Sequence, residues 1–258
     1  MECEINTIAN DVEFKSKNGE NLAGILIGPE KNTRAFVIFA HCFTCSKNVV
    51  AATRISRGLA QQGFAVLRFD FTGLGESTGD FSDTNFSSNI DDLVSAADFL
   101  RNSYQAPQLI IGHSLGGSAV ITAARQIPEI QGVVSIAAPS DPSHVSHMFK
   151  LVMNDIDQAG KADVDLAGRT FTIKKQFIED LTQKNLLHDV KNLHKALLIM
   201  HSPSDGTVNI DHARKIYEAA RHPKSFISLD SADHLLSKSK DAEYVTDIIS
   251  AWGKRYIG

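Results

Sequence analysis

The sequence has few cysteines, no excess of basic residues and no long apolar run. Its three cysteines are an odd number, which excludes the disulfide framework of a small secreted domain and favours the reducing cytoplasm. The 26 Lys and Arg residues are outnumbered by 30 Asp and Glu residues, so the basic surface of a nucleic-acid-binding protein is lacking. No export signal and no stretch of about 18 apolar residues occurs. We therefore expect a cytoplasmic protein with no membrane span and no nucleic-acid partner.

The residues that are present have the balance of a packed globular protein. Hydrophobic residues make up 43% of the 258 positions and charged residues 22%, which is too apolar for a disordered chain. No internal repeat and no low-complexity linker divides the sequence. We expect one domain over residues 1–258.

Short apolar runs alternate with helix-like segments along most of the chain. This alternation is typical of a buried parallel sheet whose strands are joined by crossover helices. The predicted strands are Ala35–Ala40, Ala65–Phe71, Leu109–Gly112, Gly132–Ala138, Ala196–His201 and Phe226–Asp230. Before them, Val12–Lys15 and Leu22–Ile27 flank the turn dipeptide Asn18-Gly19, which predicts an antiparallel hairpin at one edge. The expected fold class is α/β, with a mostly parallel sheet of about eight strands and helices on both faces.

Two helices are predicted from apolar residues that recur on one helical face. The first contains Ile90, Leu93 and Leu100, and Ser88 with Asp91 three residues later predicts its capped start. The second contains Val245, Ile249 and Trp252 near the end of the sequence. Both helices are expected to pack on the sheet.

One interval, about residues 139–192, interrupts the alternation. It contains no convincing strand, although Phe177, Ile178 and Leu181 are spaced as in a short helix. An interval of this length is too long for a plain loop in a compact domain. We predict a small lid insertion over an active site, in which Phe177 and Leu181 touch the substrate; a surface excursion is the alternative.

The strongest chemical signal is Gly112-His113-Ser114-Leu115-Gly116, between a predicted strand and a helix of small residues. A serine in a tight turn between strand and helix needs small neighbours, because the turn is strained and the elements approach closely. The turn exposes the hydroxyl, and the helix N-terminus supplies backbone N–H groups for an oxyanion. Ser114 is therefore the predicted nucleophile.

A serine nucleophile needs a base and an acid that orients the base. Among ten histidines, His234 follows the last predicted strand, where a loop at the carboxyl end of the sheet returns it to Ser114. Asp205 follows the strand before that and gives the chain order Ser, Asp, His. Asp141, after the preceding strand, is the alternative acid.

The loop after the strand Ala35–Ala40 should hold one of two oxyanion donors. The N–H of Leu115 is the first predicted donor and that of Phe43 the second, with Thr44 as a lesser alternative. Cys42 and Cys45 flank these residues and are interpreted as small packed thiols rather than a redox pair. A disulfide between them is expected to displace the Phe43 N–H and lower the activity.

No metal or cofactor is expected. His144 and His147 have ligand-like spacing but no third ligand in register. The stretch Asp70–Ser77 lacks the dinucleotide fingerprint and a Walker lysine, and is interpreted as scaffold.

Together, His41–Lys47, Phe69–Gly75, Gly112–Gly117, Asp205 and His234 resemble the α/β-hydrolase fold, in its serine-esterase and serine-aminopeptidase-like branch. The resemblance covers nearly the whole chain. The first two stretches more narrowly resemble a bacterial hydrolase domain that is often fused to an OsmC-like domain. This narrower resemblance implies an OsmC-like domain or partner. The chain ends at Gly258 without room for such a domain, as expected of a stand-alone or truncated version.

The resemblance implies Ser114 as nucleophile, His234 as base, Asp205 as acid, and Phe43 and Leu115 as oxyanion donors. One departure is Cys42, where many family members carry glycine. The expected function is a serine hydrolase that cleaves a small-molecule carboxylic ester, or an amide or thioester, through an acyl-enzyme. Two alternatives are a redox or binding module that uses Cys42 and Cys45, and a cofactor-free peroxidase on the same fold.

Overall fold

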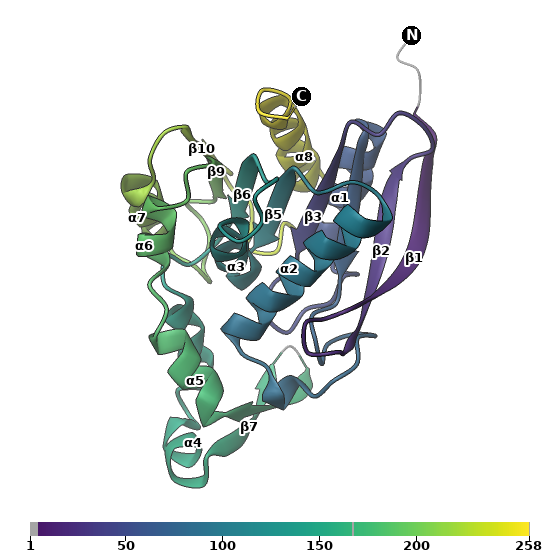
Figure 1. Ribbon diagram of the computed structural model, residues 1–258. Coiled ribbons are helices and arrows are strands. Elements are labelled where there is room, and N and C mark those ends of the chain that lie inside the picture. Colours follow the sequence, from purple (N-terminus) through teal and green to yellow (C-terminus); the bar gives the residue numbers. More distant parts are fainter. Residues whose placement is uncertain (1–4, 167, 258) are drawn as a thin grey trace.

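An eight-stranded sheet runs through the middle of the computed structural model, which describes residues 5–166 and 168–257 (Figure 1). The strand order is β1-β2-β4-β3-β5-β6-β9-β10; β2 is antiparallel to both neighbours, and the six strands from β4 to β10 are parallel. The strands are β1 (Thr7–Lys15), β2 (Asn21–Pro29), β3 (Ala35–Ala40), β4 (Phe64–Phe69), β5 (Leu109–His113), β6 (Gly132–Ile136), β9 (Ala196–His201) and β10 (Lys224–Ser228). The predicted mostly parallel sheet with an antiparallel N-terminal hairpin is confirmed.

Helices cover both faces of the sheet. They are α1 (Val50–Gln61), α2 (Phe86–Ser103), α3 (Leu115–Ala124), α6 (Leu186–Lys191), α7 (Asp211–Ala219) and α8 (Ser239–Gly253), with a short 3-10 helix at Phe81–Asp83. Apolar residues of α1 and α8, such as Ile55 and Val245, join one buried cluster, whereas those of α2 and α3, such as Leu93 and Val120, join the other. The two clusters are the two layers of core on either side of the sheet.

The start of α2 differs from the prediction. Ser88 is not the cap, because Asn85 has extended backbone and its side chain accepts a hydrogen bond from the Ser88 N–H at 2.9 Å. The Ser88 hydroxyl in turn accepts one from the Asn85 N–H, also at 2.9 Å. This reciprocal capping box moves the helix start back to Phe86.

The strand β10 also differs from the prediction, by two residues at each end. It begins at Lys224 rather than Phe226, because it lies at the edge of the sheet and its polar first residues still pair with Leu197 and Leu198 of β9. Apolar content defines a buried strand well but an edge strand poorly, since one side of an edge strand faces solvent.

The interval between β6 and β9 is a folded insertion. It contains a 3-10 helix (Pro142–Phe149), α4 (Met153–Ala159), β7 (Lys161–Leu166), β8 (Arg169–Lys174) and α5 (Lys175–Thr182). The short helix expected near Phe177 is present, but the expectation of no strand is wrong, because β7 and β8 pair as an antiparallel hairpin. Figure 1 shows α4, β7 and α5 beyond one end of the sheet.

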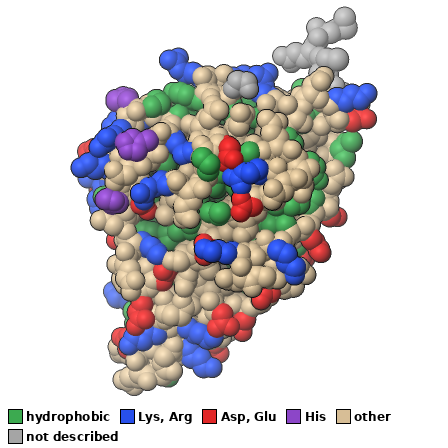
Figure 2. Space-filling model, in the orientation of Figure 1, with side chains coloured by type: hydrophobic (Ala, Val, Ile, Leu, Met, Phe, Trp, Pro, Cys, Tyr) green, Lys and Arg blue, Asp and Glu red, His purple; other side chains and the backbone are tan. Residues whose placement is uncertain are grey.

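The surface carries charges of both signs. On the face in Figure 2, Lys and Arg side chains lie among Asp and Glu side chains, in keeping with a formal net charge of −4. None of the helices in the described ranges has both the length and the apolar character of a membrane span.

Candidate active site

Ser114 lies in a strained turn between β5 and α3. Its φ is 56°, in the left-handed region that non-glycine residues rarely adopt, and its N–H donates to the Ile136 carbonyl at 2.9 Å. The flanking glycines are required by close approach: a Cβ at Gly112 would overlap the backbone of Gly116, and one at Gly116 would overlap the carbonyl oxygen of His41. Backbone from two loops therefore converges on the serine, as the sequence predicts.

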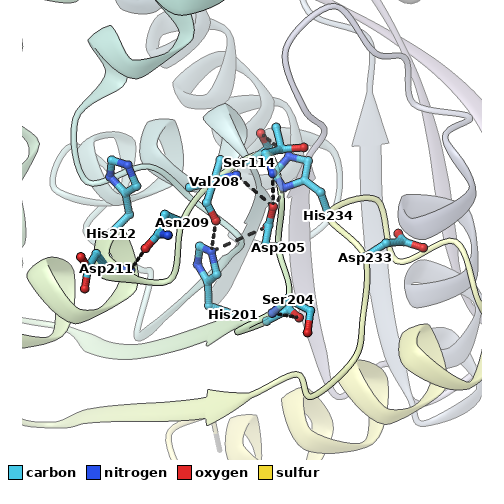
Figure 3. Close-up of polar contacts among 12 residues, drawn as sticks. Ser114, His201, Ser204, Asp205, Val208, Asn209, Asp211, His212, Asp233 and His234 are labelled. Atoms are coloured by element: carbon cyan, nitrogen blue, oxygen red, sulfur yellow. Dashed lines mark hydrogen bonds and ion pairs between the residues drawn. The ribbon is translucent and has the colours of Figure 1, made fainter.

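The structure brings Ser114, His234 and Asp205 together in one line of hydrogen bonds (Figure 3). The Ser114 hydroxyl lies 3.0 Å from Nε2 of His234, and Nδ1 of His234 lies 2.7 Å from Oδ2 of Asp205. The three residues follow β5, β10 and β9, whose carboxyl ends meet at the same edge of the sheet. A histidine with Nδ1–H toward the carboxylate presents an unprotonated Nε2 to the serine.

Asp205 is held in the ionised state that this arrangement needs. Burial alone raises the pKa of its carboxyl, but hydrogen bonds from His234 and from the Val208 N–H outweigh burial, and the pKa is lowered overall. Oδ1 accepts from the N–H groups of Thr207 and Val208 at 2.8 and 2.9 Å, which leaves Oδ2 for His234. The carboxylate is fixed from both sides. The alternative acid, Asp141, instead caps the 3-10 helix by accepting from the Ser143 N–H at 2.9 Å.

Two further buried histidines support these loops. Nε2 of His113 donates to the His234 carbonyl oxygen at 2.6 Å, and Nε2 of His201 donates to the Val208 carbonyl oxygen at 2.8 Å. Burial, together with the nearby His234, lowers the pKa of His113 to about 4, and burial lowers that of His201. Both rings are therefore neutral at neutral pH and serve as hydrogen-bond donors to the backbone of His234 and of the loop after Asp205. Sequence reasoning did not assign either residue.

Two backbone amides beside the serine have no acceptor among the described residues. Within the described residues, neither the N–H of Phe43 nor that of Leu115 donates a hydrogen bond to a protein acceptor. Both residues line the cavity that contains Ser114 and His234. An oxyanion hole requires backbone N–H donors of this kind, without an acceptor in the protein.

Cys42 and Cys45 form a disulfide, so the prediction of two packed thiols is wrong. An odd cysteine count excludes a disulfide framework but leaves a single local pair open. The pair closes a tight turn in which the Cys45 N–H donates to the Cys42 carbonyl at 3.1 Å and Thr44 adopts a φ of 58°. The shift of the Phe43 N–H on closing this disulfide stays a prediction, because the structure holds the disulfide form alone.

Three charged residues that sequence reasoning missed fasten this loop, defined as residues 41–48. Buried Asp70 accepts from the Lys47 N–H and from Lys47 Nζ, each at 2.6 Å, and Lys47 is itself buried. Arg169, on the insertion, donates to the Thr44 carbonyl oxygen. The only sequence signal for the pair of Lys47 and Asp70 is an Asp at the end of a buried strand, and no sequence signal marks Arg169.

The cavity beside Ser114 has a volume of about 480 Å³. Its apolar lining comes from the core loops and the insertion and includes Val49, Leu115, Val145, Met148, Leu166 and Val208. Phe177 and Leu181, predicted to touch the substrate, do not line this cavity and are instead buried at 2% and 0% exposure in the hydrophobic core that also contains Leu93 and Val120. The apolar face of α5 that contains these two residues packs into the hydrophobic core.

His144 and His147 also line this cavity. The His144 ring lies 4.7 Å from the rings of His147 and His212, between centroids. Nδ1 of His212 accepts from the Ser140 N–H at 3.1 Å. Across the described ranges, no three or more His, Cys, Asp or Glu side chains are grouped to hold a metal ion.

Comparison with known proteins finds similar chains of known structure or curated sequence. The esterase domain of a Rhodothermus marinus protein is 46% identical, with a TM-score of 0.79 over 97% of this chain and 100% of that one. The uncharacterized protein YfhR of Escherichia coli O157:H7 is 26% identical over 88% of this chain and 74% of its own length. The mitochondrial palmitoyl-protein thioesterase ABHD10 of Mus musculus is 23% identical over 80% of this chain and 70% of its own.

A sequence profile for the serine aminopeptidase S33 family matches residues 31–161, just over half of the chain. That range contains the loop 41–48, the serine turn and the first part of the insertion. The chain belongs to the serine aminopeptidase S33 family and has the α/β-hydrolase fold.

Proposed function

We propose that the protein is a serine hydrolase that cleaves a carboxylic ester with an apolar acyl group through an acyl-enzyme. The observation that carries the proposal is the line from Ser114 Oγ to His234 Nε2, 3.0 Å, and from His234 Nδ1 to Asp205, 2.7 Å. A nucleophile, its base and an orienting acid within hydrogen-bond reach are the requirements for acyl transfer.

In the first half of the reaction, Nε2 of His234 takes the Ser114 proton while Oγ attacks the carbonyl carbon. The carbonyl oxygen gains a negative charge and accepts hydrogen bonds from the N–H groups of Phe43 and Leu115. Each such donor contributes about 3 kcal/mol in related chemistry. His234 then gives its proton to the leaving alcohol, and the C–O bond breaks to leave the acyl group on Ser114.

In the second half, His234 takes a proton from water, whose oxygen attacks the acyl carbon. The same two N–H groups hold the second oxyanion, and His234 returns the proton to Ser114 as the acid leaves. Ionised Asp205 stabilises the imidazolium in both halves. No step requires a cofactor.

The lining of the cavity supports an apolar acyl group. Side chains from the insertion, Val145, Met148 and Leu166, face the same cavity as Ser114, so the insertion acts as a lid over the acyl site. A thioester is the second candidate, favoured by the similarity to a protein named palmitoyl-protein thioesterase. An acyl-enzyme accepts hydrogen peroxide in place of water to release a peracid, which is the route for the peroxidase alternative. An OsmC-like partner and a cytoplasmic location stay predictions from the sequence.

The test is hydrolysis of p-nitrophenyl esters from acetate to decanoate, beside matched acyl thioesters, by the wild type and Ser114→Ala. We expect turnover that is highest for medium or long chains and is lost in the variant. Turnover by Ser114→Ala equal to that of the wild type would contradict the proposal. Adding hydrogen peroxide to the same assays measures perhydrolysis.

A further inference from the structure

The disulfide between Cys42 and Cys45 brackets the Phe43 donor. The four residues form one turn, with Phe43 and Thr44 at its two central positions and the Cys45 N–H donating to the Cys42 carbonyl at 3.1 Å. The backbone orientation at Phe43 therefore depends on whatever holds this turn closed.

The turn contains a conformation that its sequence disfavours. Thr44 has a φ of 58°, and a β-branched residue with positive φ is a genuine outlier. Such a conformation persists only where the surroundings impose it. Three restraints act on Thr44 here: the disulfide across the turn, the hydrogen bond from Arg169 to its carbonyl oxygen, and the hydrogen bond of 2.7 Å that its hydroxyl donates to the Phe43 carbonyl.

The disulfide is also reachable from the active site. Both cysteines line the cavity of about 480 Å³ that contains Ser114. Cys42 is 6% exposed and Cys45 is half-buried, so Cys45 is the more accessible of the two residues. A cross-link kept only for stability gains nothing from a position in the substrate cavity.

We propose that Cys42 and Cys45 form a reversible thiol–disulfide exchange site, with a dithiol as its reaction partner, and that the disulfide form holds the oxyanion turn in its active geometry. The regulatory part of this inference rests on the proposed function of the same site. In the dithiol form Thr44 relaxes toward negative φ, the Phe43 N–H turns away from the oxyanion position, and turnover falls.

The exchange balances without any further reactant. A thiolate of the dithiol attacks Sγ of Cys45, the protein S–S bond breaks, and the electron pair leaves on Sγ of Cys42, which takes a proton. The second thiol of the reductant then displaces Cys45 from the mixed disulfide, and Cys45 takes the second proton. The protein gains two electrons and two protons, and the reductant becomes a cyclic disulfide.

The experiment uses the full chain carrying Cys3→Ser, so that any thiol that appears belongs to the pair. The protein is equilibrated in dithiothreitol buffers of graded redox ratio, desalted and divided into three portions. Thiols are counted by alkylation and mass spectrometry, kcat and KM are measured on a p-nitrophenyl ester, and the Phe43 amide is followed by ¹⁵N NMR. We expect kcat to fall about tenfold to 100-fold as two thiols appear, with KM little changed, and to recover on reoxidation.

Two variants separate the turn from a general loss of structure. Thr44→Gly removes the penalty on positive φ, so kcat in this variant should respond to reduction much less than in the wild type. Cys42→Ala/Cys45→Ala should have the low kcat of the reduced wild type under all redox conditions. Equal sensitivity to reduction in the wild type and Thr44→Gly would overturn the role of the turn.

Full kcat in the fully reduced wild type would overturn the inference. If no ester is hydrolysed in either redox state, the proposed function fails, and the Phe43 amide still decides the switch. In that case an unchanged amide resonance on reduction refutes the switch, and a reversible shift supports a redox-controlled turn.

Discussion

Replacing Asp205 with Asn tests how the acid controls the base. In the wild type, Oδ1 accepts from two backbone N–H groups and Oδ2 accepts from Nδ1 of His234. Asn keeps its single oxygen on the two N–H groups and turns its NH₂ toward His234. Nδ1 must then accept, so the proton moves to Nε2, where it prevents His234 from taking the Ser114 proton.

The size of the effect follows from the cost of turning the amide over. A flipped Asn restores the correct tautomer but leaves the Thr207 and Val208 N–H groups facing its NH₂. An unsatisfied buried donor costs about 1 to 3 kcal/mol, and the Thr207 N–H is only partly buried, so the wrong tautomer is favoured by about 1 to 6 kcal/mol. At 1.36 kcal/mol per factor of ten, kcat should fall by about 5-fold to 10⁴-fold.

The assay is kcat on a p-nitrophenyl ester, with circular dichroism to establish that the fold is kept. Asp141→Asn is the matched control and should stay within a few-fold of wild type, because Asp141 only caps a 3-10 helix. Asp205→Asn with activity near wild type, or Asp141→Asn as the crippling change, would refute the reasoning.

Three further predictions follow from the structure. His113→Leu should lower kcat about tenfold to 100-fold with little change in KM, because the His234 carbonyl loses the donor that lies 2.6 Å away. The control variant His113→Gln keeps a donor and should retain most of the wild-type rate. Burial raises the pKa of Asp92 to about 6 against its hydrogen bonds from Thr72. The free energy of unfolding should therefore fall by about 3 kcal/mol in total as the pH rises from well below 4 to well above 6, because the folded state loses a proton that the unfolded state has already lost. Asp92→Asn should remove this slope in urea titrations, and an unchanged slope would assign it to other groups. Met148→Ser should lower turnover of decanoate more than of acetate esters, and an equal loss on both would place Met148 outside the acyl site.

The buried strands could be predicted from the sequence, whereas the exposed hairpin and the helix cap could not. Ala35–Ala40 and Ala196–His201 have the predicted bounds, because continuous apolar runs mark strands covered on both faces. The hairpin of β7 and β8 was missed because Asp163 and Asp165 face solvent and interrupt its apolar content. The cap at Asn85 was missed because Ser88 forms the other half of the same capping box.

The arrangement of the site was predictable to the extent that backbone topology determines it. Ser114, Asp205 and His234 each follow a parallel strand, so their convergence at one edge of the sheet could be expected from chain order. The supporting contacts could not. The bond from Arg169 to Thr44 joins residues 125 positions apart, and the spacing of Cys42 and Cys45 fits free thiols as well as a disulfide.

The most direct test of the central claim is to locate the covalent adduct of a fluorophosphonate by peptide mass spectrometry. We predict one adduct, on Ser114 in the wild type, absent in Ser114→Ala and strongly reduced in His234→Ala, with loss of ester turnover in both variants. An adduct on a different serine, or ester turnover that survives Ser114→Ala, would contradict the account.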